Sequence, residues 1–177
     1  PNRIIHCFNG TDALNIAIKG ALRENDHVVC SALDHNSVSR HLQHLVDVGV
    51  ITLTRVPFGG DGLIDPDAVR RAMRSNTRLV TLPHASNVIG VIQPLEPLGR
   101  MVREHDALFL VDAAQSAGVV NIDVERDFVD LLAVPGHKSL LGPTGTGALY
   151  VDPRAELQAW REGGTGSDSA RRRQPTE

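Results

Sequence analysis

The stretch RLVTLPHASNVIGVIQPLEPLGRMVREHDALFLVD, residues 78–112, decides the fold that we predict for this chain. It opens with an apolar run at 78–83, continues with a helical pattern at 94–105 and closes with a second apolar run at 107–112. A strand, a helix and a second strand in this order form a unit in which both strands run parallel and the helix crosses one face of the sheet. The stretch therefore predicts an α/β fold.

The alternation of strands and helices continues on both sides of this unit. The Asp65-Pro66 pair, for example, predicts a helix start, because the Asp side chain can cap a helix and Pro suits its first turn. We expect a mostly parallel sheet with helices on both faces. The predicted strands are 3–8, 28–30, 50–56, 78–83, 107–112, 129–134 and 147–151, and the predicted helices are 10–22, 37–48, 66–73, 94–105 and 153–161.

The chain is expected to be one domain of a longer protein. It begins at Pro1 without an initiator Met and enters its first predicted strand almost at once. We therefore expect residues 1–162 to form a large domain that is incomplete at both ends. Residues 163–177 (GGTGSDSARRRQPTE) are rich in Gly, Ser and Arg, and they predict a loop leading towards a further C-terminal part.

The composition is that of an ordinary globular protein. Hydrophobic residues make up 41% of the 177 residues, and 18 Lys+Arg against 21 Asp+Glu give a net charge of -3. These values exclude a disordered chain, and the lack of a basic excess argues against a nucleic-acid partner. No apolar run reaches the ~18 residues of a membrane span, so no membrane partner is expected. Two cysteines, Cys7 and Cys30, form no disulfide framework, which predicts a cytoplasmic location.

Residues with chemically useful side chains follow the predicted strands. In open α/β sheets, ligands bind outside the carboxyl ends of the strands. We therefore expect one site there, built from Asn9 to Thr11, Asp34 and His35, His84 to Asn87, Asp112 to Gln115, and Gly136 to Lys138.

Lys138 is a candidate nucleophile. It lies between an apolar strand and the glycine-rich turn GPTGTG, and a desolvated amine at such a place attacks carbonyl groups. The alternative is an ordinary surface lysine. Lys19 and Lys138 are the only lysines among the 18 Lys+Arg, and this scarcity favours a chemical role for Lys138.

Asp112, Gln115, Gly10 and Thr11 suggest a bound cofactor. A carboxylate at the end of an apolar strand is expected to be partly buried and to need a cation, either an Arg or the protonated ring nitrogen of a pyridine cofactor. Gln115 would face the same way from a helical turn, or it is a cap or a surface amide. Gly10 and Thr11 begin a helix directly after a strand, which suits a phosphate group or, alternatively, is a plain helix cap.

His35 and Asn87 are further candidates. His35 can stack on a planar ring, transfer protons or cap a helix, and Asn87 can bond to a cofactor oxygen or belong to an ordinary turn. His41 and His44 are interpreted as surface histidines, because they lack the HExxH pattern of a zinc site, and no metal is expected. The chain also lacks a GxGxxG motif after its first strand, a P-loop and a GxSxG motif.

Five short motifs occur together in this chain: NGTDALN at 9–15, DHNS at 34–37, HASN at 84–87, DAAQ at 112–115 and GHK at 136–138. In this order and spacing, the chain resembles the class V aminotransferase group of fold-type I enzymes, which use pyridoxal 5'-phosphate (PLP). Within this group it is most similar to the cysteine desulfurase and selenocysteine lyase branch. The resemblance extends over nearly the whole chain and implies a PLP-transferase large domain.

The resemblance implies a role for each candidate residue. Lys138 would form the Schiff base with PLP and then move protons, and Asp112 would pair with the pyridinium nitrogen. Gln115 and Asn87 would bond near the phenolic oxygen of the ring. His35 would stack on the ring and take part in catalysis.

The resemblance assigns the phosphate group of PLP to Gly10, Thr11 and His137. Many members of the group carry Ser at the position of Pro135, whose ring offers neither a hydroxyl nor an N–H. We therefore expect this chain to hold the phosphate group differently or more weakly.

The activity implied for the whole protein is that of a homodimeric cysteine desulfurase, which converts the amino acid L-cysteine to L-alanine and an enzyme-bound persulfide and passes sulfur to an acceptor protein. The catalytic cysteine, a substrate-binding arginine and a threonine from the partner subunit are expected beyond residue 177. Neither Cys7 nor Cys30 matches that nucleophile, and Cys7 is expected to be a small core residue. The alternatives are another class V aminotransferase, a PLP lyase such as selenocysteine lyase, and a non-catalytic, truncated dimerisation module.

Overall fold

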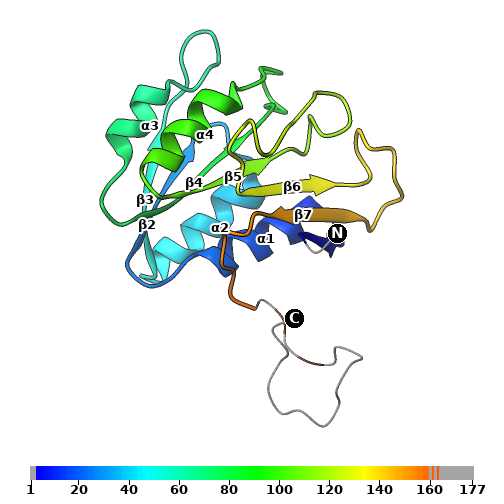
Figure 1. Cartoon of the computed structure of the whole chain (residues 1–177), viewed down its shortest axis with the longest axis horizontal. Helices are drawn as coiled ribbons and strands as arrows, with labels where there is room; N and C mark the ends of the chain where they lie inside the picture. Colours follow the sequence, from blue (N-terminus) through cyan, green and yellow to red (C-terminus); the bar gives the residue numbers. More distant parts are fainter. Residues whose placement is uncertain (1–2, 160, 162, 164–177) are drawn as a thin grey trace.

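The computed structural model describes residues 3–159, 161 and 163. Within them, seven strands form one sheet in the order β1-β7-β6-β5-β4-β2-β3 (Figure 1). All predicted strands and the first four predicted helices are confirmed, with ends that differ by a few residues. The strands are β1 Ile4–Cys7, β2 Asp26–Ser31, β3 Ile51–Val56, β4 Thr77–Pro83, β5 Leu108–Asp112, β6 Leu131–Pro135 and β7 Gly147–Val151, and the helices are α1 Gly10–Ala21, α2 Asn36–Asp47, α3 Pro66–Ala72 and α4 Leu95–Glu104.

The sheet is mostly parallel, as predicted. β2 pairs in parallel with β3 and β4, and β5 pairs in parallel with β4 and β6. β7 runs antiparallel to both of its neighbours, β6 and β1. A loop, and not a helix, connects β6 to β7, and such a connection suits antiparallel neighbours.

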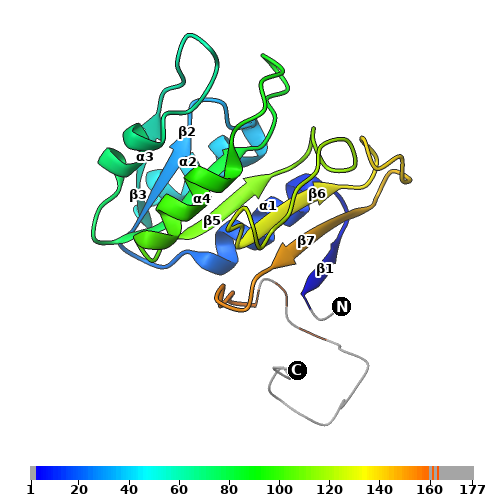
Figure 2. The same ribbon diagram turned by 45° about the horizontal axis from the view of Figure 1, so that its top comes forward.

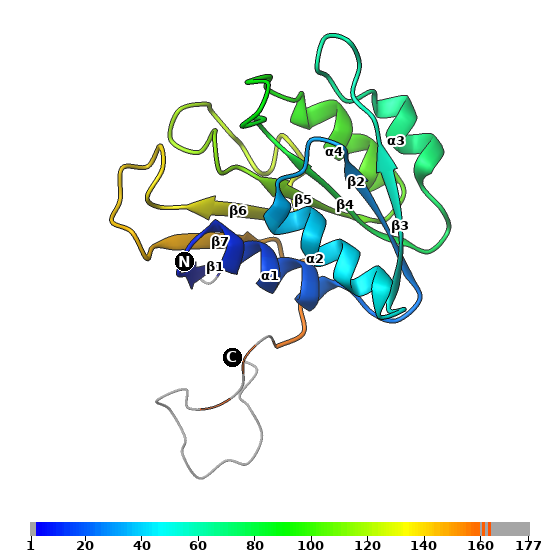
Figure 3. The same cartoon turned by 180° about the vertical axis from the view of Figure 1, so that it is seen from behind.

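Helices cover both faces of the sheet, again as predicted. α1 and α2 lie side by side on one face, and α3 and α4 lie on the other (Figure 1 and Figure 3). In β5, Leu108 and Leu110 belong to the core on the α1 side, whereas Phe109 and Val111 belong to the core on the α4 side. Alternate residues of a strand point to opposite faces, so a strand covered on both sides is apolar throughout.

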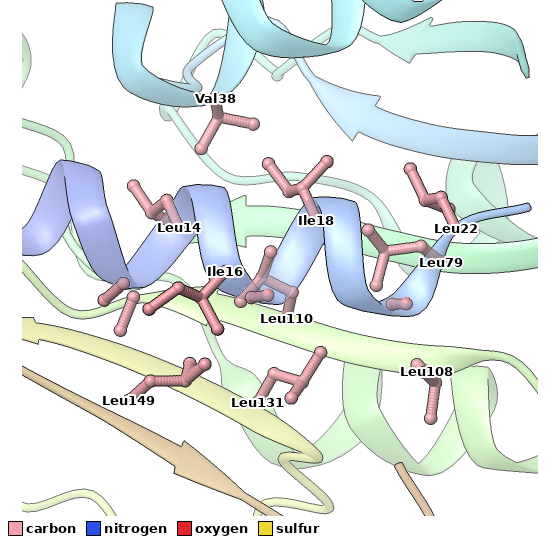
Figure 4. Packing of buried hydrophobic residues seen from close by; sticks show 14 of the residues in the cluster. Leu14, Ile16, Ile18, Leu22, Val38, Leu79, Leu108, Leu110, Leu131 and Leu149 are labelled. Atoms are coloured by element: carbon pink, nitrogen blue, oxygen red, sulfur yellow. The ribbon is translucent and has the colours of Figure 1, made fainter. Parts of the chain in front are cut away.

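α1 packs against the sheet and against the neighbouring helix α2. Figure 4 shows Ile18 on the side of Val38, which belongs to α2, and Ile16 on the side of Leu149, which belongs to β7. Ala17 is fully buried, and its small side chain allows the helix to lie close to the sheet. This packing fixes the N-terminus of α1 at the carboxyl edge of the parallel strands.

The last predicted helix is wrong. Residues 153 and 154 form a turn, and residues 155–159 have no regular secondary structure and contact the C-terminal end of α1. The backbone N–H of Gln158 donates to the carbonyl oxygen of Gly20 (2.9 Å), and the Arg154 guanidinium contacts the buried carboxylate of Asp130 (3.0 Å). These contacts with distant parts of the chain outweigh the helix-forming composition of the segment.

The prediction that His41 is a surface residue is also wrong. His41 is only 9% exposed, because it lies on the same side of α2 as the buried Val38 and Leu42. Neither of its ring nitrogens has a hydrogen-bond partner in the described structure. Burial, together with the charges of Lys19 and His44, lowers the pKa of His41 to about 4. His44 is exposed, as predicted.

The predicted C-terminal loop lies outside the described residues, apart from Gly163. In the described part of the chain, every helix is too short or too polar to span a bilayer.

Candidate cofactor-binding site

A cavity of about 350 Å³ lies at the carboxyl ends of the strands. The loops that follow β4, β5 and β6 extend from this edge of the sheet (Figure 2). Loops that are far apart in the sequence therefore contribute to one site. The cavity lining includes all eight residues predicted to bind the cofactor, Gly10, Thr11, His35, Asn87, Asp112, Gln115, His137 and Lys138.

The N-terminus of α1 forms one end of the cavity. Asn9 caps this helix, because its side-chain oxygen accepts a hydrogen bond from the backbone N–H of Asp12 (2.9 Å). The N–H groups of Gly10 and Thr11 have no partner within the helix, and the positive end of the helix dipole favours an anion. The Pro135 ring packs against Gly10, where a Cβ atom would lie 3.4 Å from the proline Cδ. This end of the cavity suits a phosphate group.

Asp112 is a buried carboxylate at the end of β5. It is 4% exposed, and its Oδ1 accepts one hydrogen bond, from the backbone N–H of Ala114 (2.9 Å). Burial raises the pKa of Asp112, although the Ala114 N–H and the charges of Lys138 and His35 act in the opposite direction. No ion pair to Asp112 is present within residues 3–159, 161 and 163, so an Arg of this region is not its partner.

Lys138 lies on a turn between β6 and β7. The N–H of Gly136 donates to the carbonyl oxygen of Thr146 (2.8 Å), and the N–H of Gly142 donates to that of Gly136 (2.8 Å). A side chain at Gly136 would overlap that of Thr146, so this close approach requires glycine. Lys138 is exposed and lines the cavity, and its amine is therefore accessible to a ligand.

His35 caps the N-terminus of α2 and is linked to α1 through Ser37. Its Nδ1 accepts a hydrogen bond from the backbone N–H of Ser37 (3.2 Å) and lies 2.9 Å from the Ser37 Oγ. The same Ser37 Oγ lies 2.9 Å from the Oγ1 of Thr11. The three side chains therefore form a continuous hydrogen-bonded chain along the cavity.

His84 joins the two loops that carry Asn87 and Gln115. The backbone N–H of His84 donates to the carbonyl oxygen of Asp112 (2.9 Å), and its Nδ1 lies 2.9 Å from the Oγ of Ser116. Both side chains of the second contact are buried. His84 thereby fixes the separation between the loops after β4 and β5.

Cys7 and Cys30 lie away from the cavity lining. They are 8% and 0% exposed, which confirms Cys7 as a core residue. Burial, followed by the charge of Asp12, raises the pKa of the Cys7 thiol to about 11. Burial, followed by the charge of Asp34, raises that of Cys30 to about 12. Neither thiol is a nucleophile in this fold, because the reactive species is the thiolate.

Sequence reasoning missed part of the cavity lining. Ser37 could have been identified, because a hydroxyl residue two positions after His35 at a helix start commonly bonds locally. An apolar residue such as Leu14 carries no chemical signal in the sequence. The lining residues outside the predicted ranges are Leu14, Ser37, Pro83 and Pro135, whereas the predicted site residues that do not line the cavity are Asp34, His84, Ser86, Ala113 and Gly136.

The cavity fits PLP in three respects. Asp112 is a buried carboxylate that needs a cation, and the protonated pyridine nitrogen is one. Lys138 supplies an accessible amine for a carbonyl group. The start of α1 at Gly10 and Thr11 supplies an anion site for a phosphate group.

A mostly parallel sheet with these groups at its carboxyl edge has the fold of the type I PLP-dependent transferases. A sequence profile described as aminotransferase class-V matches residues 1–174. The chain belongs to the aminotransferase class-V family.

Two solved structures are similar to this chain. One is the apo structure of a cysteine desulfurase from Thermococcus onnurineus NA1, with a TM-score of 0.84 and 30% identity over 92% of this chain and 42% of that chain. The other is described as SspA in complex with cysteine, with a TM-score of 0.85 and 36% identity over 91% of this chain and 48% of that chain. These likenesses confirm the predicted fold class.

Similar sequences carry cysteine desulfurase names. The cysteine desulfurase IscS of Tolumonas auensis is 40% identical over 170 residues, which are 93% of this chain and 42% of that protein. The mitochondrial cysteine desulfurase of Arabidopsis thaliana is 36% identical over 93% of this chain and 37% of its own length. The chain thus spans less than half the length of these relatives.

Proposed function

We propose that this chain is the PLP-binding domain of a cysteine desulfurase, which converts L-cysteine to L-alanine and retains the sulfur as a persulfide. The observation that carries the proposal is Asp112, a buried carboxylate that forms no ion pair in the described structure and lies in the same cavity as Lys138. The desulfurase names of the similar proteins support the choice of substrate.

PLP, when bound, supplies a positively charged ring that draws electrons from bonds at the α-carbon of an amino acid. In this proposal Asp112 keeps the proton on the ring nitrogen, and Gln115 and Asn87 bind near the phenolic oxygen. His35 lies against the ring. The Lys138 amine would hold the cofactor covalently, and as a free amine it would carry protons to and from the substrate.

The phosphate group is proposed to lie at the N-terminus of α1. The backbone N–H groups of Gly10 and Thr11, the Thr11 hydroxyl and the His137 side chain are its proposed donors. Pro135 offers this group no donor, so the helix end takes a larger share of the binding.

The sulfur transfer needs a thiolate that Cys7 and Cys30 do not supply, since both are buried with raised pKa values. We assign it to a cysteine elsewhere in the full-length protein. That thiolate attacks the Sγ of the substrate, the substrate Cβ–Sγ bond breaks, and the carbon fragment takes up the electron pair and a proton to leave as alanine. One thiol and one cysteine thus give one persulfide and one alanine, and no external oxidant is required.

The proposed protein is a homodimer that acts on a small amino acid and passes the persulfide sulfur to an acceptor protein. Val119 and Leu141, in the segments that follow β5 and β6, are 70% and 91% exposed, and such apolar side chains would be covered by a second subunit in this proposal.

Cofactor binding is tested by borohydride reduction of the full-length protein loaded with PLP, followed by peptide mapping. We expect a phosphopyridoxyl label on Lys138 that is absent from Lys138→Ala. Lys19→Ala, which changes the other lysine of this chain, is the matched control and should retain the label. A folded, PLP-saturated protein with no label on Lys138 rejects the assignment of this residue.

The reaction is tested by incubating the PLP-loaded, unreduced protein with L-cysteine and a thiol reductant, and by measuring the alanine and sulfide that form. Equal amounts of both products support desulfuration. Formation of a keto acid instead identifies an aminotransferase, and activity confined to selenocysteine identifies a selenocysteine lyase. A dimer that neither binds PLP nor turns over is the non-catalytic module.

A further inference from the structure

Ser37 connects two functional parts of the cavity that the sequence motifs treat separately. Its Oγ lies 2.9 Å from the His35 Nδ1 and 2.9 Å from the Thr11 Oγ1. Thr11 belongs to the first turn of α1, and His35 is the N-cap of α2. A half-buried serine therefore bridges the proposed phosphate end of the cavity and the proposed ring end.

The backbone of Ser37 determines which nitrogen of His35 carries the proton. Its N–H points at the His35 Nδ1 (3.2 Å), and a backbone N–H can only donate. Nδ1 must therefore offer a lone pair, and the neutral ring carries its proton on Nε2. A proton on Nδ1 would turn this contact into a repulsive one between two N–H groups.

The Ser37 hydroxyl strengthens the same arrangement. With its proton directed at Nδ1, the Ser37 Oγ has lone pairs left to accept the Thr11 hydroxyl proton. The direction of donation then runs from Thr11 to Ser37 to His35. The remaining ring nitrogen, Nε2, then carries the N–H that the neutral ring can donate.

We propose that Ser37 is a positioning residue, which holds the His35 imidazole in the tautomer protonated at Nε2 and couples that ring to Thr11. The proposal rests on the proposed function for its catalytic consequence, namely that His35 meets the bound substrate and cofactor as a hydrogen-bond donor. The geometry that carries it belongs to the chain alone and can be tested without cofactor.

The first test is a long-range ¹H–¹⁵N spectrum of the histidine rings in the cofactor-free, full-length protein. The His35 signals are identified by their loss in His35→Gln. We expect an unprotonated, hydrogen-bonded Nδ1 and a protonated Nε2 in the wild type. Ser37→Ala should shift the Nδ1 resonance, because the hydroxyl donor is lost while the backbone N–H remains. Ser37→Thr, which keeps the hydroxyl, should restore the wild-type pattern.

Thr11→Val should shift the His35 Nδ1 resonance in the same direction as Ser37→Ala but less, because it removes only the far end of the chain. Ser39→Ala, on the same helix and outside the cavity lining, is the matched control and should leave the resonance unchanged. A wild-type His35 protonated at Nδ1, or a Ser37→Ala spectrum identical to that of the wild type, overturns the proposal.

The second test is kinetic and uses the PLP-loaded protein with L-cysteine. Loss of one neutral hydrogen bond to His35 should lower kcat about five-fold with little change in KM. In the His35→Gln background, Ser37→Ala should have no further effect, since it acts through the ring. An equal effect in both backgrounds overturns the coupling, whereas failure to bind PLP counts against the proposed function and leaves the spectral result standing.

Discussion

Replacing Asp112 by Asn is expected to raise the free energy of unfolding of the cofactor-free protein and to weaken its binding of PLP. The carboxylate is 4% exposed, has one hydrogen bond from the Ala114 N–H, and has no ion-pair partner in the described structure. A buried polar group that lacks its partners costs about 1–3 kcal/mol. Asn keeps an oxygen that can accept the Ala114 hydrogen bond but removes the charge, so we expect a gain of about 1–2 kcal/mol at pH 8.

The pH dependence of this gain follows from the direction of the pKa shift. Burial raises the folded-state pKa of Asp112, so the protonated side chain stabilises the fold fully below its unfolded-state pKa of about 4. This contribution is lost as the pH rises through the folded-state pKa. The advantage of Asp112→Asn should therefore be small at pH 4 and grow towards pH 8.

Urea unfolding of the cofactor-free full-length protein at pH 4 and pH 8 measures this difference. The matched control is Asp127→Asn, which changes a carboxylate that is also 4% exposed but is bound by Arg126 at 2.8 Å. Burial acts to raise the pKa of Asp127, but the hydrogen bonds from Arg126 and the Asp123 N–H lower it overall. Asp127→Asn should therefore destabilise the protein at pH 8, with the opposite sign to Asp112→Asn.

PLP binding supplies the second half of the prediction. A charge-assisted hydrogen bond contributes about 1.5–3 kcal/mol, so Asp112→Asn should weaken PLP binding about 10- to 100-fold in a spectroscopic titration. If Asp112→Asn destabilises the cofactor-free protein as Asp127→Asn does, the argument that the charge of this carboxylate is unpaired without cofactor is refuted. Unchanged PLP affinity would refute its pairing with the ring nitrogen.

Three further predictions follow from the core. Folding lowers the pKa of His41 from 6.5 to about 4, so the wild-type protein loses free energy of unfolding as the pH falls from 8 to 5. In urea unfolding, His41→Leu should make this loss smaller by about 1–2 kcal/mol. An unchanged pH slope contradicts this. Cys7 and Cys30, with pKa values of about 11 and 12, should stay unmodified by iodoacetamide at pH 8 until the protein is unfolded, as peptide mapping would reveal. Gly99→Ala should lower the free energy of unfolding by about 1–3 kcal/mol, since the new Cβ would overlap the backbone oxygen of Asp127. Thermal unfolding measures this, and a melting temperature equal to that of the wild type would exclude such close packing.

The sequence alone determined the order of the elements and the edge of the sheet where the site lies. Apolar strands such as 107–112 alternate with amphipathic helices, and this pattern is sufficient to predict a parallel sheet covered on both faces. Because the strands run parallel, residues that follow them must meet at one edge. Asp112 and Lys138 could therefore be assigned to one cavity before their positions were known.

The sequence could not predict features that depend on contacts between distant segments. Residues 153–159 have a helix-forming composition, but the hydrogen bond from Gln158 to Gly20 and the ion pair of Arg154 with Asp130 hold them in a non-helical conformation. His41 was predicted to be a surface residue because it lacks a metal-site pattern, whereas the packing of α2 buries it.

The partners of polar side chains were also decided only by the tertiary structure. The sequence predicted a carboxylate at Asp112 that is buried and needs a cation, but only the tertiary structure shows that no Arg of the described residues pairs with it. The link from Thr11 through Ser37 to His35 joins residues of two helices and appears only when their N-termini meet. Periodicity fixes which elements form, because it reflects local burial, whereas the pairing of side chains depends on how those elements pack in three dimensions.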